Sequence, residues 1–278
     1  MRTMKIVADS SADLLELPGV AFASAAMKVI TAQREFVDDE ALDVEGMVDW
    51  FATYKGRSKS SCPNPADWLE AFGDADDIFC VTITSGLSGS YNTACAAKQM
   101  YEAEHEGRRV FVIDSLSAGP ELELIVEELV DLIGRGLDYD QICQKIQAYT
   151  RKTGLLFMLE SLKNFAANGR VSPAVAKIAG ILGIRIVGKA SDVGELEPMN
   201  KCRGEAKSLD TILSHLKSFG LKEGKVRIRH CRNEGAAQRL REKIRELLPK
   251  VDVKIGKCRG LCSFYAENGG LLVGFEKM

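Results

Sequence analysis

The chain has 278 residues, of which 46% are hydrophobic and 27% charged, with 37 Lys and Arg against 39 Asp and Glu. This composition excludes a disordered or fibrous protein, and the length predicts about two domains of ~100 to 200 residues each. The formal net charge of −2 gives no general affinity for nucleic acid. Residues 201–259 nevertheless hold 17 Lys and Arg against 7 Asp and Glu. We expect this part of the chain to present a basic surface to an anionic partner.

The first half alternates short apolar runs with amphipathic stretches, which is typical of parallel strands joined by crossover helices. Asp43 and Asp138 precede two of the predicted helices as N-cap residues, and Pro65 opens another at the favoured first position. The predicted strands are residues 5–8, 78–83 and 110–113, and the predicted helices are residues 44–54, a short one from 65, 90–101, 120–133 and 139–150. These elements predict a three-layer α/β/α domain around a parallel sheet, spanning residues 1–152.

The second half mixes hairpins with helices and therefore predicts an α+β domain with a mixed sheet, spanning residues 153–278. A turn at residues 192–194 joins two of its strands into a hairpin. The predicted strands are residues 155–159, 185–189, 195–202, 225–231, 251–255 and 271–275, and the predicted helices are residues 161–167, 172–182, 205–218 and 234–247.

Targeting, membrane-spanning and metal-binding segments are not predicted. An acidic residue, Asp9, comes before any apolar leader develops, and the longest uncharged run, residues 78–97, contains nine Thr, Ser, Asn or Gly residues. The eight cysteines form no C-x-x-C pair, and only Cys258 and Cys262 are close in sequence. We therefore expect reduced thiols in a cytoplasmic protein, without a metal or other cofactor.

A candidate anion site lies at residues 84–90, TSGLSGS, where a predicted buried strand ends and a helix begins. Helix N-termini offer unpaired N–H groups, and glycine lets an anion approach the backbone. A carboxylate or phosphate site and simple helix capping by Ser85 or Ser88 explain this pattern equally well. The hydroxyl-rich loop at residues 57–65 is a candidate for a second set of donors.

Two enzymatic readings of these segments are weaker. A serine-dependent acyl hydrolase or small-anion enzyme using Ser85 or Ser88 remains the alternative function, but the G-x-S-x-G pattern fails at Ser90 and the chain has only three histidines as potential bases. Residues 183–190 match the P-loop spacing except at Ala190, where a hydroxyl is required. A strand is the better interpretation of this second segment.

Five motifs in order resemble the DegV family: KIVADSSADL at residues 5–14, KSSCPNP at 59–65, TSGLSGSY at 84–91, VIDS at 112–115 and NGRVS at 168–172. The resemblance extends over nearly the whole chain. It implies a two-domain α/β protein that holds one long-chain fatty acid in a tunnel between the domains. It also implies a carrier without catalytic activity, which presents the carboxylate to a separate fatty-acid kinase.

The resemblance also implies particular site residues. Ser60 and Ser85, with the Gly86 backbone, match positions that hold the carboxylate, and Arg170 and Arg203 match arginines near the head-group mouth that face the kinase. Tyr265 stands where the family has a histidine near the head group, and Cys62 replaces a glutamine.

Overall fold

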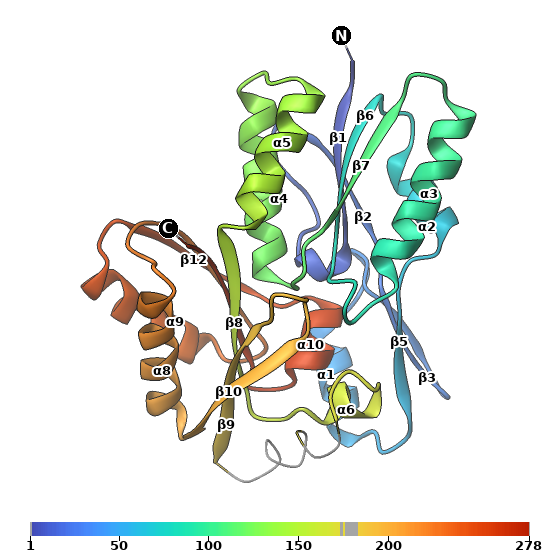
Figure 1. The fold of residues 1–278 in the computed structure, drawn as a ribbon. Coiled ribbons are helices and arrows are strands. Elements are labelled where there is room, and N and C mark those ends of the chain that lie inside the picture. The colour runs from blue at the N-terminus through green and yellow to red at the C-terminus, as the bar shows by residue number, and fades with distance from the viewer. Residues whose placement is uncertain (1, 173–174, 176–182, 278) are drawn as a thin grey trace.

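The computed structural model describes residues 2–172, 175 and 183–277, and its strands form a four-stranded, a six-stranded and a three-stranded sheet (Figure 1). The predicted α/β class, with one parallel and one mixed sheet, is confirmed. The helix predicted at residues 172–182 lies almost entirely outside the described residues.

The four-stranded sheet is parallel, in the order β2-β1-β6-β7. Alternate residues of its strands point to opposite faces, so each face buries its own apolar core. Helices α2 and α3 cover one face and α4 and α5 the other, as the three-layer prediction requires. The bounds are β1 Met4–Asp9, β2 Ala21–Ala25, β6 Asp77–Thr82, β7 Arg109–Asp114, α2 Pro65–Phe72, α3 Ser90–Glu104, α4 Pro120–Gly134 and α5 Tyr139–Thr150.

The six-stranded sheet is mixed, in the order β10-β9-β8-β13-β11-β12. The predicted hairpin is confirmed, because β9 and β10 pair antiparallel. Helices α8 and α9 pack on one face of this sheet. The bounds are β8 Thr153–Leu159, β9 Ile184–Ala190, β10 Leu196–Arg203, β11 Gly224–His230, β12 Val251–Lys257, β13 Leu271–Glu276, α8 Glu205–Ser218 and α9 Glu234–Leu247.

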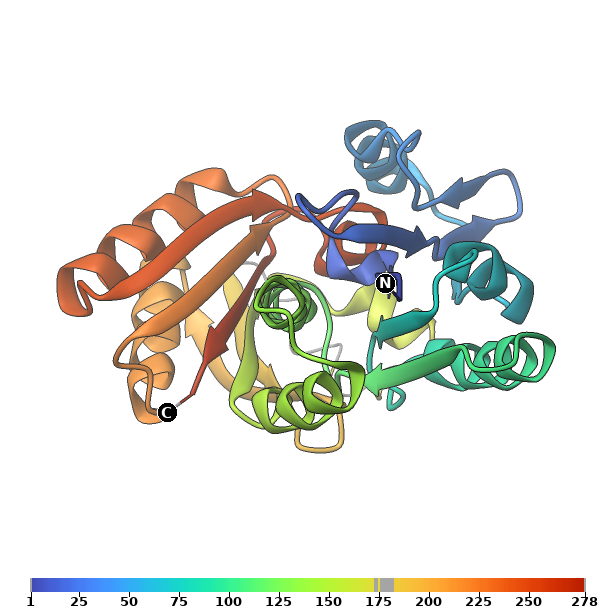
Figure 2. The ribbon, with the colours of Figure 1, turned by 90° about the horizontal axis from the view of Figure 1, so that it is seen from above.

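Helix α4 lies between the two large sheets, which Figure 2 shows from above. Its apolar side packs on the parallel sheet, while Glu123 and Glu127 reach β11 of the other sheet. Glu123 pairs with Arg229 at 2.8 Å, and Glu127 pairs with Arg227 at 2.6 Å. The two halves of the chain are therefore joined by ion pairs as well as by apolar packing.

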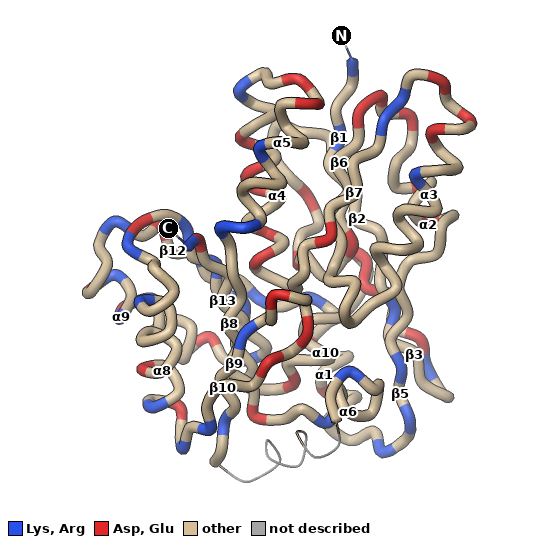
Figure 3. Tube along the Cα trace, viewed as in Figure 1, with Lys and Arg blue, Asp and Glu red and all other residues tan. Residues whose placement is uncertain are grey.

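These pairs change the interpretation of the basic segment at residues 201–259. Many of its cations pair with carboxylates, including Glu45, Asp49, Glu123 and Glu127 of the first half of the chain. Figure 3 accordingly shows Lys and Arg interspersed with Asp and Glu over this part of the molecule. Much of the local charge excess is thus neutralised within the fold.

The three-stranded sheet was not predicted from the sequence. Its order is β4-β3-β5, all antiparallel, and its strands are short: β3 Lys28–Thr31, β4 Glu35–Val37 and β5 Ser58–Ser61. The residues of β5 are all polar, so no apolar alternation marks them as a strand. Helix α1, Val44–Thr53, packs beside this sheet and begins at the predicted cap, Asp43.

Two short helices in the second half of the chain complete the wall of the cavity described in the next subsection. Helix α6 spans Lys163–Ala167 and α10 spans Gly260–Ala266. Helix α10 was not predicted, because its N-cap position, Arg259, carries no capping side chain. Asp38, distant in sequence, accepts hydrogen bonds from the Gly260 and Leu261 N–H groups, each at 2.8 Å, and so fixes the start of this helix.

Candidate functional site

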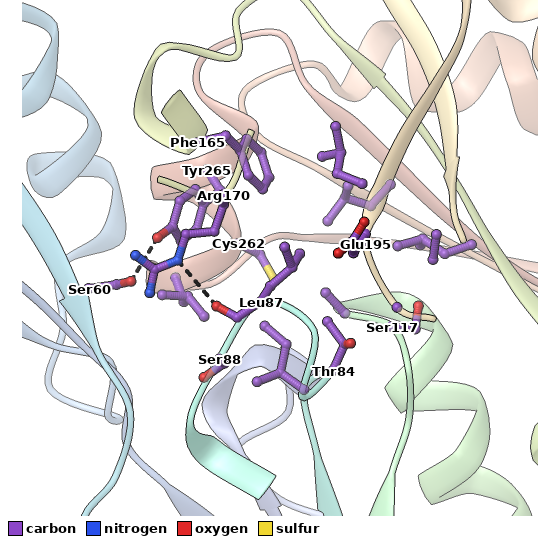
Figure 4. Close-up of a pocket in the computed structure, with 18 of the residues that line it drawn as sticks. Ser60, Thr84, Leu87, Ser88, Ser117, Phe165, Arg170, Glu195, Cys262 and Tyr265 are labelled. Atoms are coloured by element: carbon purple, nitrogen blue, oxygen red, sulfur yellow. Dashed lines mark hydrogen bonds between the residues drawn. The ribbon is translucent and has the colours of Figure 1, made fainter. Parts of the chain in front are cut away.

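A cavity of about 290 Å³ lies between the six-stranded sheet, α10 and the loops that follow β6 and β7 (Figure 4). Leu155, Phe157 and Leu159 line it because alternate residues of β8 share one face of the sheet. Further apolar lining comes from Met27, Ile83, Leu87, Ala118, Phe165, Ala190, Leu196, Leu261, Ala266 and Leu272. The cavity therefore suits an apolar ligand over most of its length.

Ser60, Tyr265 and Arg170 lie together at one end of this cavity, on the left of Figure 4. The Ser60 and Tyr265 hydroxyl oxygens are 2.7 Å apart, so one hydroxyl donates to the other and a single O–H remains for a ligand. Burial raises the pKa of the Tyr265 phenol, which stays neutral at physiological pH. Arg170 lies beside this pair and lines the same end.

The NGR turn connects these residues. The Asn168 side-chain oxygen accepts from the Ser60 N–H at 3.1 Å, and Arg170 Nε donates to the Leu87 carbonyl at 3.2 Å. A second guanidinium nitrogen of Arg170 donates to the Asn168 carbonyl. Strand β5, α6 and the loop after β6 are therefore held in one arrangement around the polar end.

The loop after β6 is fixed by the buried carboxylate of Asp9. It accepts from the Ile83 N–H at 2.8 Å and from the Ser90 hydroxyl at 2.6 Å, so it holds both ends of the loop. Between these ends the chain turns, and the Ser88 N–H donates to the Thr84 carbonyl at 3.2 Å. The turn directs Thr84, Ser88 and Gly89 into the cavity lining.

The structure places Ser85 and Gly86 outside that lining, although the sequence predicted them as the carboxylate-binding residues of the loop. Both are exposed, and the Ser85 N–H donates to Asp114 at 3.1 Å. Gly86 packs against the β9–β10 turn, where a Cβ atom would lie 2.8 Å from the Val193 carbonyl oxygen. The glycine is thus explained by the approach of a second chain segment, and Ser88, not Ser85, is the loop serine among the lining residues.

Arg203 also lies away from the cavity. It is exposed at the end of β10, opposite Ile184, whereas the cavity contacts β10 at Leu196. Seven residues of strand separate these two positions, or about 23 Å. Of the residues predicted for the site, the structure therefore brings together Ser60, Arg170 and Tyr265.

Charged residues at the opposite end were missed by sequence reasoning. Glu195 lines the cavity there, and Figure 4 shows Glu195 across from Ser60. Lys189 also belongs to the lining, but its Nζ lies 6.0 Å from the centroid of the Phe219 ring, which packs with the core beside α8. Lys189 pairs with Glu197 at 3.5 Å. Only the pairing of β9 with β10 brings these residues to the cavity, and a hairpin pattern alone gives no sign of it.

No histidine is found among the described residues that form the lining, so the serines there have no Ser–His pair. His105 and His215 contact Tyr101 and Asn200 elsewhere. Within the described part of the chain no group of three His, Cys, Asp or Glu residues is arranged to hold a metal ion. Burial raises the pKa of Cys258 and Cys262, which leaves both as thiols. None of the helices in the described ranges is long and apolar enough to cross a membrane.

Comparison with known proteins gives consistent matches over the whole chain. A family model described as "Uncharacterised protein, DegV family" matches residues 3–277. A DegV domain-containing protein of Streptococcus pneumoniae is 45% identical over 278 residues, covering 99% of both chains. Among solved structures, a DegV family protein from Eubacterium eligens loaded with heptadecanoic acid is 44% identical, with a TM-score of 0.97 over 99% of this chain and 100% of the other. The Streptococcus pneumoniae Fatty Acid Kinase (Fak) B3 protein loaded with linoleic acid has the same identity, TM-score and coverage.

Proposed function

The chain belongs to the DegV family, and on this premise we propose that it is a carrier that binds one long-chain fatty acid and presents the carboxylate to a separate fatty-acid kinase. The observation that carries the proposal is an apolar cavity that ends on a cluster of neutral hydrogen-bond donors and one arginine. Two similar proteins hold a heptadecanoic and a linoleic acid in their structures.

The size of the cavity supports this ligand. At about 290 Å³ the cavity is close to the lower end of the roughly 300 to 1,000 Å³ found for small-molecule pockets. Its apolar lining suits a single acyl chain. Burying its methylenes contributes about 0.8 kcal/mol each before ordering costs, so the tail supplies most of the affinity.

The head group is assigned to the polar end. We place the carboxylate against Ser60 and Ser88, close to the N-terminus of α3 at Gly89 and Ser90. A buried carboxylate must recover the hydrogen bonds it had in water, and two hydroxyls with helix N–H groups provide them. Arg170 adds a positive charge beside this site while two of its nitrogens are held by carbonyl oxygens. This assignment replaces Ser85 and Gly86 by Ser88 and Gly89.

In this proposal the chain itself performs no chemistry. The kinase would bring the nucleotide and transfer the phosphoryl group, and Tyr265 would keep the head-group site neutral beside Ser60. The free thiols of the eight cysteines support a reducing, cytoplasmic location, where a kinase has ATP.

Extraction of the purified protein followed by mass spectrometry tests the binding step. We expect a fatty acid of 16 to 18 carbons at about one per chain, exchangeable for added palmitate or oleate. Absence of lipid in the extract together with no uptake of either acid would refute the proposal.

A further inference from the structure

A second hollow, an open groove of about 1000 Å³, lies on the other side of the wall formed by β5, α6 and α10. Its floor is apolar, with Met47, Phe51 and Phe264 contributed by α1 and α10. Met47 and Phe264 are almost fully buried beneath it. The groove is distinct from the fatty-acid cavity, with which it shares no lining residue.

The rim of the groove is positively charged. Arg57, Lys59 and Lys163 are exposed, and within the described residues their side chains have no ion-pair or hydrogen-bond partner. Figure 3 shows these basic positions along β5 and on α6. Arg232 also lines the groove, but Glu45 and Asp49 already neutralise it.

Glu267 is the carboxylate among the described lining residues. It accepts hydrogen bonds from the Ser161 hydroxyl at 2.9 Å and from the Asn164 N–H at 3.4 Å. Lys163 also lies close enough to this carboxylate for its charge to act on it, but Arg57 and Lys59 face the groove without an acid beside them among the described lining residues. An anionic occupant is therefore favoured.

The groove and the fatty-acid cavity lie back to back, separated by single layers of chain. Lys59 lines the groove and its neighbour Ser60 the cavity, as expected for successive residues of a strand. In the same way, Phe264 of α10 and Asn164 of α6 line the groove, while their neighbours Tyr265 and Phe165 line the cavity. A molecule seated in the groove would thus contact residues adjacent to the proposed head-group site.

We propose that this groove is the docking site for an acidic segment of the kinase, an inference that rests on the proposed function. Carboxylates of the segment would pair with Arg57, Lys59 and Lys163, and its apolar side chains would cover the floor. A free inorganic anion would leave that apolar floor exposed, whereas an amphipathic acidic segment satisfies both features. The basic stretch at residues 201–259 is a poorer surface for this role, because many of its cations are already paired.

Charge reversal at Lys59 and Lys163 together tests the proposal, with the Streptococcus pneumoniae fatty-acid kinase subunit as the probe. We expect the variant to bind the kinase at least tenfold more weakly than the wild type, and the wild-type affinity to fall as salt is added. Ala52→Trp, an exposed position on the groove wall, should weaken docking without changing charge. Fatty-acid affinity should stay within about twofold of the wild-type value in both variants, since none of the three changed residues lines the cavity.

The matched control reverses Lys207 and Lys217, two exposed lysines of α8 outside the groove. The docking proposal is overturned if the groove variants bind the kinase as tightly as the wild type does. It is also overturned if the control loses as much kinase affinity as the groove variants, or if the wild type does not bind the kinase at all. A wild type that carries fatty acid under any of these outcomes leaves fatty-acid binding intact. A wild type that neither carries nor takes up fatty acid would instead refute the proposed function.

Discussion

Replacing Ser88 by alanine should weaken the binding of a long-chain fatty acid, whereas the same change at Ser85 should not. The two serines lie three residues apart in one loop, but Ser88 lines the cavity and Ser85 is exposed. The Ser88 oxygen accepts from the Ser90 N–H at 3.2 Å, so its own proton remains free to donate to a carboxylate. The pair therefore separates the head-group contact from any general effect on the loop.

The magnitude follows from removing one donor to a buried charge. A hydrogen bond to a charged group contributes about 1.5 to 3 kcal/mol, which corresponds to roughly a 10- to 150-fold rise in Kd for Ser88→Ala. Ser85→Ala should change Kd by less than about twofold. A fatty alcohol of the same length, which carries no charge, should lose much less affinity than the acid on the Ser88 change.

Displacement of a fluorescent fatty acid by the acid and by the alcohol measures all of these constants. If Ser85→Ala weakened binding of the acid and Ser88→Ala did not, the head group would not lie at the polar end of this cavity. Equal losses for acid and alcohol would point to a disturbed loop instead of a lost carboxylate contact.

Three further predictions concern the framework of the site. Gly194→Ala should lower Tm by several degrees more than Gly204→Ala. A Cβ at Gly194 would lie 1.9 Å from the Thr84 hydroxyl oxygen. Gly204 has a similar positive φ but no neighbour within 4 Å, so it serves as the control for backbone strain. An equal decrease in Tm would mean that backbone strain alone, without the clash, explains the effect. Arg227→Ala should reduce the free energy of unfolding, measured with urea, by about 1 to 3 kcal/mol, because it removes the hydrogen bonds of a buried guanidinium to Glu127 and Asp252 while Lys225 and Lys254 remain beside Glu127; a loss below about 0.5 kcal/mol would contradict this role. Burial raises the pKa of Asp13 to about 7 from 3.8, so folding favours its protonated form, and its contribution to stability should fall as pH rises from about 4 to about 7. Asp13→Asn should flatten that part of the stability–pH curve, and an unchanged slope would assign it to another group.

The large elements were predictable because their residues repeat with a clear period. Helices α8 and α9 have the predicted bounds, and α1 starts after the predicted cap. The three-stranded sheet and α10 were not predictable, since β5 is entirely polar and α10 is capped by Asp38, more than 200 residues earlier in the chain. A local sequence pattern cannot indicate a partner so distant in sequence.

The same limit explains the outcome for the candidate site. The glycines and hydroxyls of the loop after β6 predicted an anion site, but choosing between Ser85 and Ser88 requires the turn that the Thr84 carbonyl and Asp9 impose. Gly86 was interpreted as making room for a ligand, whereas the β9–β10 turn occupies that space. Whether Arg203 lies near the cavity depends on which end of β10 meets the cavity, and the spacing of residues along a strand does not determine that.

We expect the two ends of the cavity to give a bound fatty acid one orientation. At the polar end, Ser60 and Ser88 supply neutral donors beside Arg170. At the other end, Glu195 lines the cavity, is exposed, and has no ion pair within the described residues. A fatty acid bound in reverse would leave the donors at Ser60 unused, and it would bring its carboxylate near a like charge that solvent screens in part, so the lost hydrogen bonds oppose this orientation most. The tail is equally apolar in either direction, so we expect the difference between the two ends to decide which way the carboxylate points. Only with the carboxylate at the Ser60 end would a kinase docked in the groove lie next to it.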